Sequence, residues 1–421
     1  MTDQSPPFGL FERSLAARYL RAKRTHGGVA MISIISFVGI MLAVAVLIIT
    51  MSVMNGFRET LLSRILGVNG HVYVDVKGYP TAEAERMARI AESVPGVVMV
   101  SPLVDEQALA VADGAASGVF VRGISKQNLQ RLDMVSSTVR GTLEGFEGVE
   151  EPTILIGERL ARRLRLVEGM GLTLMSPQGS FTPFGFSPRS KAFMVGALFN
   201  VGMAEYDAGL VYMPIEQAQI LFGRGDTFDR LEVRIQNPDA TLPIMLELRQ
   251  KLGPDVTIYD WRAENEGLVG ALIVERNVMR LILMMIVAIA ALNIASGLVM
   301  LVKNKSRDIA ILRTMGATKG AVLRIFFMAG ASIGVLGVAA GLVLGVGFCL
   351  FIGPIQDLIQ AATGFDLFPG DVYSLETLPA KVEWGEVWLV SGFALLMSFV
   401  ATLPMAWRAS RLDPVEALRY E

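Results

Sequence analysis

Few residues of this chain could perform chemistry by themselves. The chain has 421 residues but only two histidines, His26 and His71, and one cysteine, Cys349. Because a structural zinc site needs about four Cys or His ligands, no Cys/His metal cluster can form. A disulfide within the chain is also impossible, and we expect neither a bound metal nor a cofactor.

The sequence also lacks the parts of an ATPase. The phosphate-binding loop Gly-x-x-x-x-Gly-Lys-Ser/Thr is absent, and no Gly-Lys pair occurs anywhere. Asp and Glu are scattered without a histidine partner, and the isolated charges at Arg280 and Glu386 make no proton relay. The net charge of −2 suggests no nucleic-acid partner. We therefore expect that the chain is not an enzyme.

Four apolar runs dominate the chain, and each is long enough to cross a bilayer as a helix, which takes about 20 residues. They cover residues 29–54, 277–302, 325–352 and 386–407. A signal peptide is the alternative for the first run, but that run is too long for a signal-peptide core and no small-residue cleavage site follows it. Trp384, Trp388 and Trp407 flank the last run, as an interfacial aromatic belt would.

Basic residues predict the orientation of these spans. They gather in three segments, residues 1–28, 303–324 and 408–421. Short Lys/Arg-rich segments beside membrane spans stay in the cytoplasm. The loop 353–385 has Lys381 as its single basic residue and is placed outside. Both termini are therefore predicted to be cytoplasmic, and residues 55–275 to be extracytoplasmic.

The N-terminal segment is predicted to contain an amphipathic helix over residues 10–24. Phe11, Leu15 and Tyr19 recur there at helical spacing. Such a helix would lie on the inner membrane surface.

Residues 55–275 have the mixed charges of a folded soluble domain. Strand patterns such as His71–Val76 are mixed with helical ones such as Thr81–Val94, which indicates an α+β domain. We expect residues 69–112 and 227–260 to share one sheet, with a β-rich subdomain between them. The predicted fold class is a membrane α-helical protein with four transmembrane helices and a large α+β periplasmic domain inserted between helices 1 and 2.

The basic link 303–324 is predicted to hold a short helix, Asp308–Met315, that ends at Gly316. A surface helix held between two membrane spans could be moved by a soluble partner that binds it. In the span that follows, glycines spaced four apart favour close approach of neighbouring helices. These glycines are Gly330, Gly334, Gly337, Gly341 and Gly345.

The segment 176–189 holds three prolines, two glycines and three phenylalanines between two predicted strands. A turn so short cannot easily bury Phe181, Phe184 and Phe186. It is therefore predicted to be a projecting hairpin that docks another protein. The alternative is a long hairpin whose phenylalanines fold back on the subdomain.

Three runs of residues, together with the order of spans and insert, resemble the lipoprotein-releasing permease family (LolC/LolE). The runs are Ser52-Val53-Met54-Asn55-Gly56-Phe57, Asp308-Ile309-Ala310-Ile311-Leu312-Arg313-Thr314-Met315-Gly316-Ala317-Thr318, and Pro414-Val415-Glu416-Ala417-Leu418-Arg419-Tyr420-Glu421. The Met-Gly-Ala element is weak by itself, because it recurs in MacB-like and FtsX-like permeases. The layout covers the whole chain, and the hairpin-like segment brings the resemblance closest to LolC.

The resemblance implies a permease subunit of an ATP-driven ABC transporter in the bacterial inner membrane. Its implied partners are a LolD-like ATPase that holds ATP and Mg²⁺, a second permease half (LolE-like or an identical copy), a LolA-like periplasmic chaperone, membrane lipid and a triacylated lipoprotein substrate. The chaperone would dock on Phe181, Thr182, Pro183, Phe184, Gly185, Phe186 and Pro188. The ATPase would be coupled through Asp308, Ile309, Ile311, Leu312, Arg313, Met315 and Gly316. The lipid-binding cavity would be lined by Met51, Met54, Phe57, Met279, Leu283 and Ile286.

Other interpretations of these residues and of the function remain open. Ordinary bundle packing explains any one of the cavity residues equally well. A MacB-like mechanotransmission permease would drive a periplasmic partner, although the ATPase domain usually fused there is missing here. An FtsX-like regulator would activate a periplasmic partner by binding, but that family usually has a smaller extracytoplasmic domain.

Overall fold

A computed structural model describes residues 7–20, 27–147, 152–182, 185–363 and 379–412. The chain divides into two compact units. The first, which we call the bundle, holds the described residues of Met1–Arg58, Leu272–Phe365 and Thr377–Glu421. The second, which we call the head, holds Glu59–Ala271.

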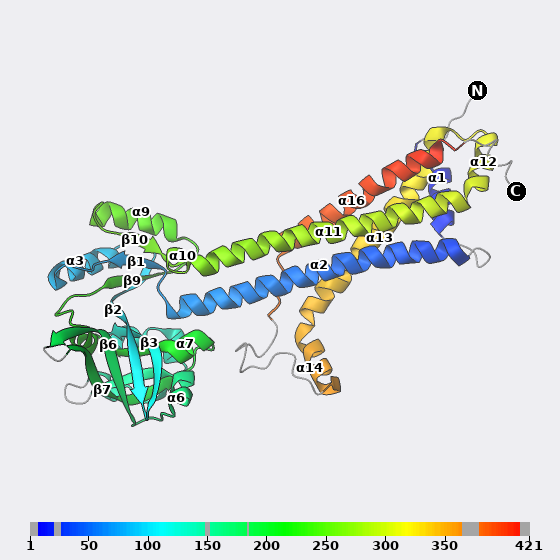
Figure 1. Cartoon of the computed structure of the whole chain (residues 1–421). Helices are drawn as coiled ribbons and strands as arrows, with labels where there is room; N and C mark the ends of the chain where they lie inside the picture. Colours follow the sequence, from blue (N-terminus) through cyan, green and yellow to red (C-terminus); the bar gives the residue numbers. More distant parts are fainter. Residues whose placement is uncertain (1–6, 21–26, 148–151, 183–184, 364–378, 413–421) are drawn as a thin grey trace. The chain divides into compact units, whose positions relative to one another are not determined.

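The described residues of the bundle are almost entirely helical (Figure 1). The helices are α1 (Leu10–Leu20), α2 (Gly27–Val68), α11 (Glu266–Asn304), α12 (Ser306–Thr314), α13 (Lys319–Leu350), α14 (Ile352–Thr363) and α16 (Trp384–Ser410). Residues 59–68 of α2 and 266–271 of α11 belong to the head. Among the described residues, four helices are long and apolar enough to cross a membrane: α2, α11, α13 and α16. The predicted runs 29–54, 277–302 and 386–407 lie within α2, α11 and α16, and the run 325–352 extends two residues past the end of α13. Helices α2 and α11 also extend beyond the predicted spans 29–54 and 277–302, because a helix continues past the residues that face lipid.

Small residues on α13 let two other helices approach it closely. A Cβ added at Gly337 would lie 2.9 Å from the Cβ of Ile40, and one at Gly341 would lie 2.7 Å from the carbonyl oxygen of Met41. Gly345 faces α2 in the same way, and Gly330 and Gly334 face Thr402 and Ser398 of α16. The predicted close packing of these glycines is therefore confirmed.

Helix α1 lies within the predicted range 10–24 and packs against α13. Phe11, on the predicted apolar face, is 51% exposed, whereas Glu12 and Ala16 are buried. The Nη2 atom of Arg324, on α13, donates to Oε1 of Glu12 at 2.7 Å. This hydrogen bond lowers the pKa of Glu12. An ion pair between Glu12 and Arg324 thus joins α1 to α13. The side chain of Tyr19 and residues 21–24 lie outside the part that the structure describes.

The loop predicted over residues 353–385 is wrong in its first part, because Ile352–Thr363 forms helix α14. Ile352, Ile355 and Leu358 recur at intervals of three residues, which is a helical spacing that the acidic character of the loop concealed.

The described part of the head contains a ten-stranded sheet in the order β10-β1-β9-β2-β3-β8-β5-β7-β4, with β6 pairing β2 and β7 off this path (Figure 1). The strands are β1 (Val72–Asp75), β2 (Val97–Ala112), β3 (Ala115–Ile124), β4 (Arg140–Gly141), β5 (Thr153–Gly157), β6 (Gly171–Thr182), β7 (Gly185–Phe199), β8 (Leu210–Pro214), β9 (Arg230–Ile235) and β10 (Ile258–Asp260).

Short helices cover this sheet. They are α3 (Thr81–Glu92), α4 (Lys126–Gln130), α5 (Asp133–Ser136), α6 (Glu158–Leu164), α7 (Ala204–Gly209), α8 (Ile215–Phe222), α9 (Thr241–Leu252), α10 (Trp261–Glu264) and the 3₁₀ helix η2 (Glu144–Glu147). Helices α3 and α9 contribute Met87 and Leu248 to a core shared with Val72, Val74 and Val233 of the sheet.

Strand β2 joins the two parts of the head. Its first half pairs antiparallel with β9, and its second half pairs antiparallel with β3 and β6. Strand β1 lies between β9 and β10. The predicted sheet shared by residues 69–112 and 227–260 is therefore confirmed, and the polar residues at the centre of β2 face both parts.

Candidate functional site

Helix α12 carries the residues predicted to couple the chain to an ATPase. Ile309 is fully buried and Leu312 packs against the core of the bundle. Ile311 is 44% exposed and Met315 is 80% exposed. The helix is therefore fixed to the bundle by one set of apolar side chains and leaves another set exposed.

Two polar contacts also hold α12. Nζ of Lys305 lies 2.8 Å from Oδ2 of Asp308. Nη1 of Arg313 donates to the carbonyl oxygen of Leu412 at 2.6 Å, just after the end of α16. Arg313 therefore connects α12 to the last membrane helix.

The end of α12 has the backbone geometry of a Schellman motif. Gly316 has φ +103°, its N–H donates to the carbonyl of Arg313, and the N–H of Ala317 donates to the carbonyl of Leu312. The side chain of Thr318 then caps the N-terminus of α13. The predicted helix end at Gly316 is confirmed.

The predicted docking segment forms the hairpin of β6 and β7. Gly179 pairs with Pro188, Phe181 with Phe186, and Thr182 with Gly185. Pro183 and Phe184 lie outside the described residues, as do the side chains of Phe181, Thr182 and Phe186. A hairpin is thus confirmed, and its use as a docking element stays a prediction.

The structure brings together part of the predicted lipid-binding set. Leu283 is in the core of the bundle, and Met51 and Ile286 pack against that core. Met54, Phe57 and Met279 are half-buried. A cavity of about 10 Å³ lined by residues of α2, α11 and α16 has room for no more than about one water. In this arrangement the three helices leave no space there for an acyl chain.

The run Ser52–Phe57 packs against the segment that leads into α16. The carbonyl of Ser52 accepts a hydrogen bond from the N–H of Lys381 at 2.8 Å. A Cβ at Gly56 would collide with the carbonyl of Pro379. Sequence reasoning singled out this run only by resemblance, and the structure gives it a packing role.

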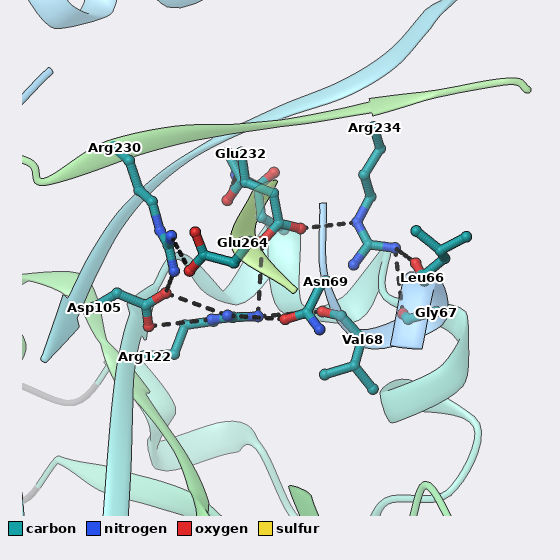
Figure 2. A network of polar contacts seen from close by, with 12 residues as sticks. Leu66, Gly67, Val68, Asn69, Asp105, Arg122, Arg230, Glu232, Arg234 and Glu264 are labelled. Atoms are coloured by element: carbon teal, nitrogen blue, oxygen red, sulfur yellow. Dashed lines mark hydrogen bonds and ion pairs between the residues drawn. The ribbon is translucent and has the colours of Figure 1, made fainter. Parts of the chain in front are cut away.

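The C-terminus of α2 is capped by two arginines that sequence reasoning missed (Figure 2). Nη1 of Arg234 donates to the carbonyls of Leu66 and Gly67, both at 3.3 Å. Nη1 of Arg122 donates to the carbonyl of Val68 at 3.2 Å. The last carbonyls of a helix have no partner within it and carry partial negative charge, which cations stabilise.

These arginines belong to a network that we call the arginine junction (Figure 2). Its charged members are Asp105, Arg122, Arg230, Glu232, Arg234 and Glu264. Both Nε and Nη2 of Arg122 donate to the carboxylate of Asp105, at 3.3 and 3.2 Å. Arg230 also pairs with Asp105, and its Nη1 lies 2.8 Å from Oε1 of Glu264. The junction therefore joins β2, β3 and β9 to the end of α2 and to α10.

Burial makes the charges of the junction depend on one another. The side chains of Arg122 and Glu232 are 7% and 2% exposed. Burial would raise the pKa of Asp105, but the positive charges of Arg122 and Arg230 outweigh it and hold the pKa below its usual value. Burial would lower the pKa of Arg122, but Asp105 and Glu232 hold it well above its usual value. Asp105 and Arg122 are therefore both ionised near neutral pH.

The sequence contains a pattern at the junction, but that pattern does not distinguish buried from exposed charges. Arg230, Glu232 and Arg234 alternate with apolar residues along one strand, so their side chains share one face. Alternating charges on a strand usually face water, and only the tertiary structure buries this face. Beside it lies a cleft of about 640 Å³ lined mainly by polar residues, including Asp75, Tyr206 and Tyr259.

Within the described ranges, no group of three or more His, Cys, Asp or Glu residues is placed to hold a metal ion.

Comparison with known proteins agrees with the architecture. The profile of the FtsX-like permease C-terminal family matches residues 280–414, and that of the MacB-like periplasmic core domain matches residues 33–251. The chain is 34% identical to the lipoprotein-releasing system transmembrane protein LolC of Xylella fastidiosa, over 97% of this chain and 98% of the relative. It is 33% identical to LolC of Neisseria meningitidis, over 97% and 99%. It is 30% identical to LolE of Haemophilus influenzae, over 95% and 97%.

The fold and the two profiles define a multi-pass membrane permease with a MacB-like core domain. The chain belongs to the LolC/LolE family of lipoprotein-releasing permeases. It is thus a permease subunit of a Lol-system ABC transporter in the inner membrane.

Proposed function

We propose that this permease extracts outer-membrane-directed lipoproteins from the inner membrane and hands them to a LolA-like periplasmic carrier. ATP, with Mg²⁺, is hydrolysed by a separate LolD-like ATPase on the cytoplasmic side, where both termini and α12 lie. A second permease half, LolE-like or identical, completes the membrane part. The head and its β6–β7 hairpin lie in the periplasm.

One observation carries the proposal: α12 is anchored to a membrane bundle yet exposes Ile311 and Met315. A sequence without a phosphate-binding loop needs an external source of work. An anchored helix with an exposed apolar surface is suited to bind a partner that supplies this work. The contact of Arg313 with Leu412 gives movement of α12 a direct route to α16.

The substrate sets the physical problem. Exposing an acyl chain to water costs about 0.8 kcal/mol per CH₂, so three chains cannot leave the membrane through open water. They must pass between apolar surfaces, entering from the lipid between α2 and α11. Both helices supply such surfaces: on α11, Leu281, Met284 and Met285 are exposed. Methionine adapts to irregular apolar shapes. Closure of the bundle on ATP binding would then move the lipid toward the carrier.

Reconstitution tests the transport reaction. Vesicles containing the permease, its second half and the ATPase should release acylated lipoprotein to the carrier when ATP is added. The same lipoprotein without acyl chains should show no ATP-dependent transfer. Equal handling of both forms would instead support a regulator or a mechanotransmission permease.

Substitution on α12 tests the coupling surface. Ile311→Asp together with Met315→Asp should weaken binding of the ATPase, because two apolar contacts are replaced by charges. Leu10→Asp is the control, since Leu10 is 87% exposed on α1. Binding that survives the double substitution would remove α12 from the coupling role.

Substitution at the hairpin tests carrier docking. Replacing Pro183 and Phe184 by Ser should abolish crosslinking between the hairpin and the carrier while ATPase binding is retained. Leu242→Ser is the matched control, because Leu242 is an exposed apolar side chain on α9. Crosslinking at wild-type yield would show that the hairpin does not hold the carrier.

A further inference from the structure

The two strands of the β6–β7 hairpin are contacted at their base by Glu106 of β2 and by the turn that follows α8. Nε2 of Gln178, on β6, donates to Oε1 of Glu106 at 3.4 Å. On β7, the guanidinium of Arg189 occupies the space where a side chain at Gly223 would stand. Arg224, the next residue, pairs with Glu106. These contacts join the hairpin base to Glu106 and to the turn at Gly223, in addition to the backbone pairing of β6 with β2 and of β7 with β5.

This base is joined to the arginine junction in two ways. Asp105 and Glu106 are consecutive on β2, so their side chains leave opposite faces of the sheet. In addition, Oδ2 of Asp229 accepts from the N–H of Asp105 at 3.2 Å, and its Oδ1 lies 3.3 Å from Nη2 of Arg224. A shift of Asp105 is therefore passed to the hairpin base through the strand and through Asp229.

Arg122 is the junction member that reaches from the strands to the end of α2. It contacts the carbonyl of Val68 and, at 3.2 Å, the Oδ1 atom of Asn69, while it also holds Asp105 and Glu232 (Figure 2). A guanidinium is planar and directs each N–H at a fixed angle, so a displaced helix end turns the group as a whole. Because the network is buried, water cannot compensate for such a rotation of the guanidinium.

We propose that Arg122 is a positioning residue that makes the orientation of the hairpin depend on the position of the α2 C-terminus. The inference rests on the proposed function, in which ATP moves the membrane helices. Displacement of Val68 and Asn69 turns Arg122, Arg122 draws Asp105 with it, and the hairpin base follows through Glu106 and Asp229. The carrier is thereby gripped or released according to the state of the bundle.

The test uses the reconstituted complex with spin labels on the head. One label is placed at Ser187→Cys, an exposed hairpin position, and a reference label at Asp239→Cys, whose side chain is 89% exposed. Cys349, the only native cysteine, is replaced by Ser. In the wild-type complex, trapping with ATP and vanadate should shift the distance between the labels. Arg122→Lys keeps the charge but cannot reach the helix and both carboxylates at once.

Arg122→Lys should abolish the ATP-dependent shift and lower lipoprotein release by at least about fivefold, while ATP hydrolysis is retained. Arg131→Lys, at an exposed arginine of the head, should behave as wild type. A purely structural role would leave the shift intact, so a shift that persists in Arg122→Lys overturns the proposal. A wild-type hairpin that does not respond to ATP overturns it as well.

Two further arms separate folding and function. If Arg122→Lys fails to fold, the double variant Glu106→Gln and Gln178→Ala, at the surface end of the route, should abolish the same shift. A shift that persists in this double variant would also contradict the proposal. A wild-type complex that shows the ATP-dependent shift but releases no lipoprotein would refute the proposed function and leave the role of Arg122 standing.

Discussion

The side-chain amide of Asn55, on α2, donates to Oε2 of Glu386 at 2.5 Å, in the first turn of α16. The two residues are 331 positions apart in the chain. Oδ1 of the same amide accepts from Arg58 at 3.1 Å, so Asn55 bridges a cation and an anion. With the close approach at Gly56, this contact fixes the start of α16 against α2.

Replacing Gly56 by Ala should destabilise this contact. The added methyl group would collide with the carbonyl of Pro379 and lie 2.9 Å from the nitrogen of Ala380, and backbone atoms cannot rotate away. We expect a loss of about 1–3 kcal/mol in the stability of the full chain, measured by thermal unfolding in detergent. Gly392→Ala on α16, where a Cβ meets open space, should cause no such loss. Equal unfolding of the two variants would contradict the packing role.

The glycine face of α13 predicts a second pair of variants on one helix. Gly341→Ala should separate α13 from α2, because the methyl group would lie 2.7 Å from the carbonyl oxygen of Met41. Disulfide crosslinking between cysteines placed on the two helices should fall. Gly347→Ala, which meets nothing within 4 Å, should leave crosslinking unchanged. A fall in crosslinking in both variants would indicate a general effect of alanine on this helix.

Gly316→Ala should loosen the end of α12. The backbone there has φ +103°, which a residue with a Cβ adopts only at a cost of about 1–3 kcal/mol. In the full chain, hydrogen exchange should become faster at the backbone N–H groups of residue 316 and of Ala317. Gly320→Ala is the control, because its Cβ would meet the flexible end of Arg324 at 3.3 Å and the hydroxyl of Thr318 at 3.9 Å, an ordinary van der Waals distance. Unchanged exchange in Gly316→Ala would mean that the turn tolerates a side chain.

His71 predicts a pH dependence of the head. Its Nδ1 accepts from the N–H of Ile235 at 3.0 Å, which requires a neutral ring. Burial and the neighbouring positive charge of Arg234 lower the pKa of His71 below its ordinary value of 6.5, despite the opposing charge of Glu232. The unfolded chain thus binds the proton more readily, so this stabilisation is complete above about pH 6.5 and is lost as the pH falls toward the folded-state pKa.

Trp261 reports on this region, because its backbone N–H donates to the carbonyl of His71. With Trp384, Trp388 and Trp407 replaced by Phe, its fluorescence should show a lower unfolding midpoint at about pH 5 than at about pH 8. His71→Asn keeps an acceptor near Nδ1 without titrating, and should show a flatter dependence. The same slope in both proteins would assign the effect to other groups.

Arg122→Met should be the most destabilising single change in the head. It leaves the buried carboxylates of Asp105 and Glu232 short of a cation, which costs about 3–5 kcal/mol. The measurement is chemical unfolding followed by Trp261 fluorescence in the same background. Arg131→Met, at an exposed arginine, should cost less than about 1 kcal/mol. Comparable losses would show that Arg122 is not held in a buried network.

The sequence by itself determined the features that depend on neighbouring residues. Uninterrupted apolar runs specified the four membrane-length helices, because hydropathy acts on each segment independently. Gly316 and Thr318 specified the end of α12 and the start of α13, because capping involves residues within one turn. Alternation and turn residues likewise indicated the β6–β7 hairpin.

Only the tertiary structure decided which polar residues are buried and with whom. Arg122 meets Val68, 54 positions away, and Asn55 meets Glu386, 331 positions away. No local pattern distinguishes such residues from solvent-exposed charges, because the stabilising partner is supplied by another element of the fold. The same holds for Phe11 and Glu12 on α1, where an ion pair with Arg324 buries the charged side chain and leaves the aromatic one exposed.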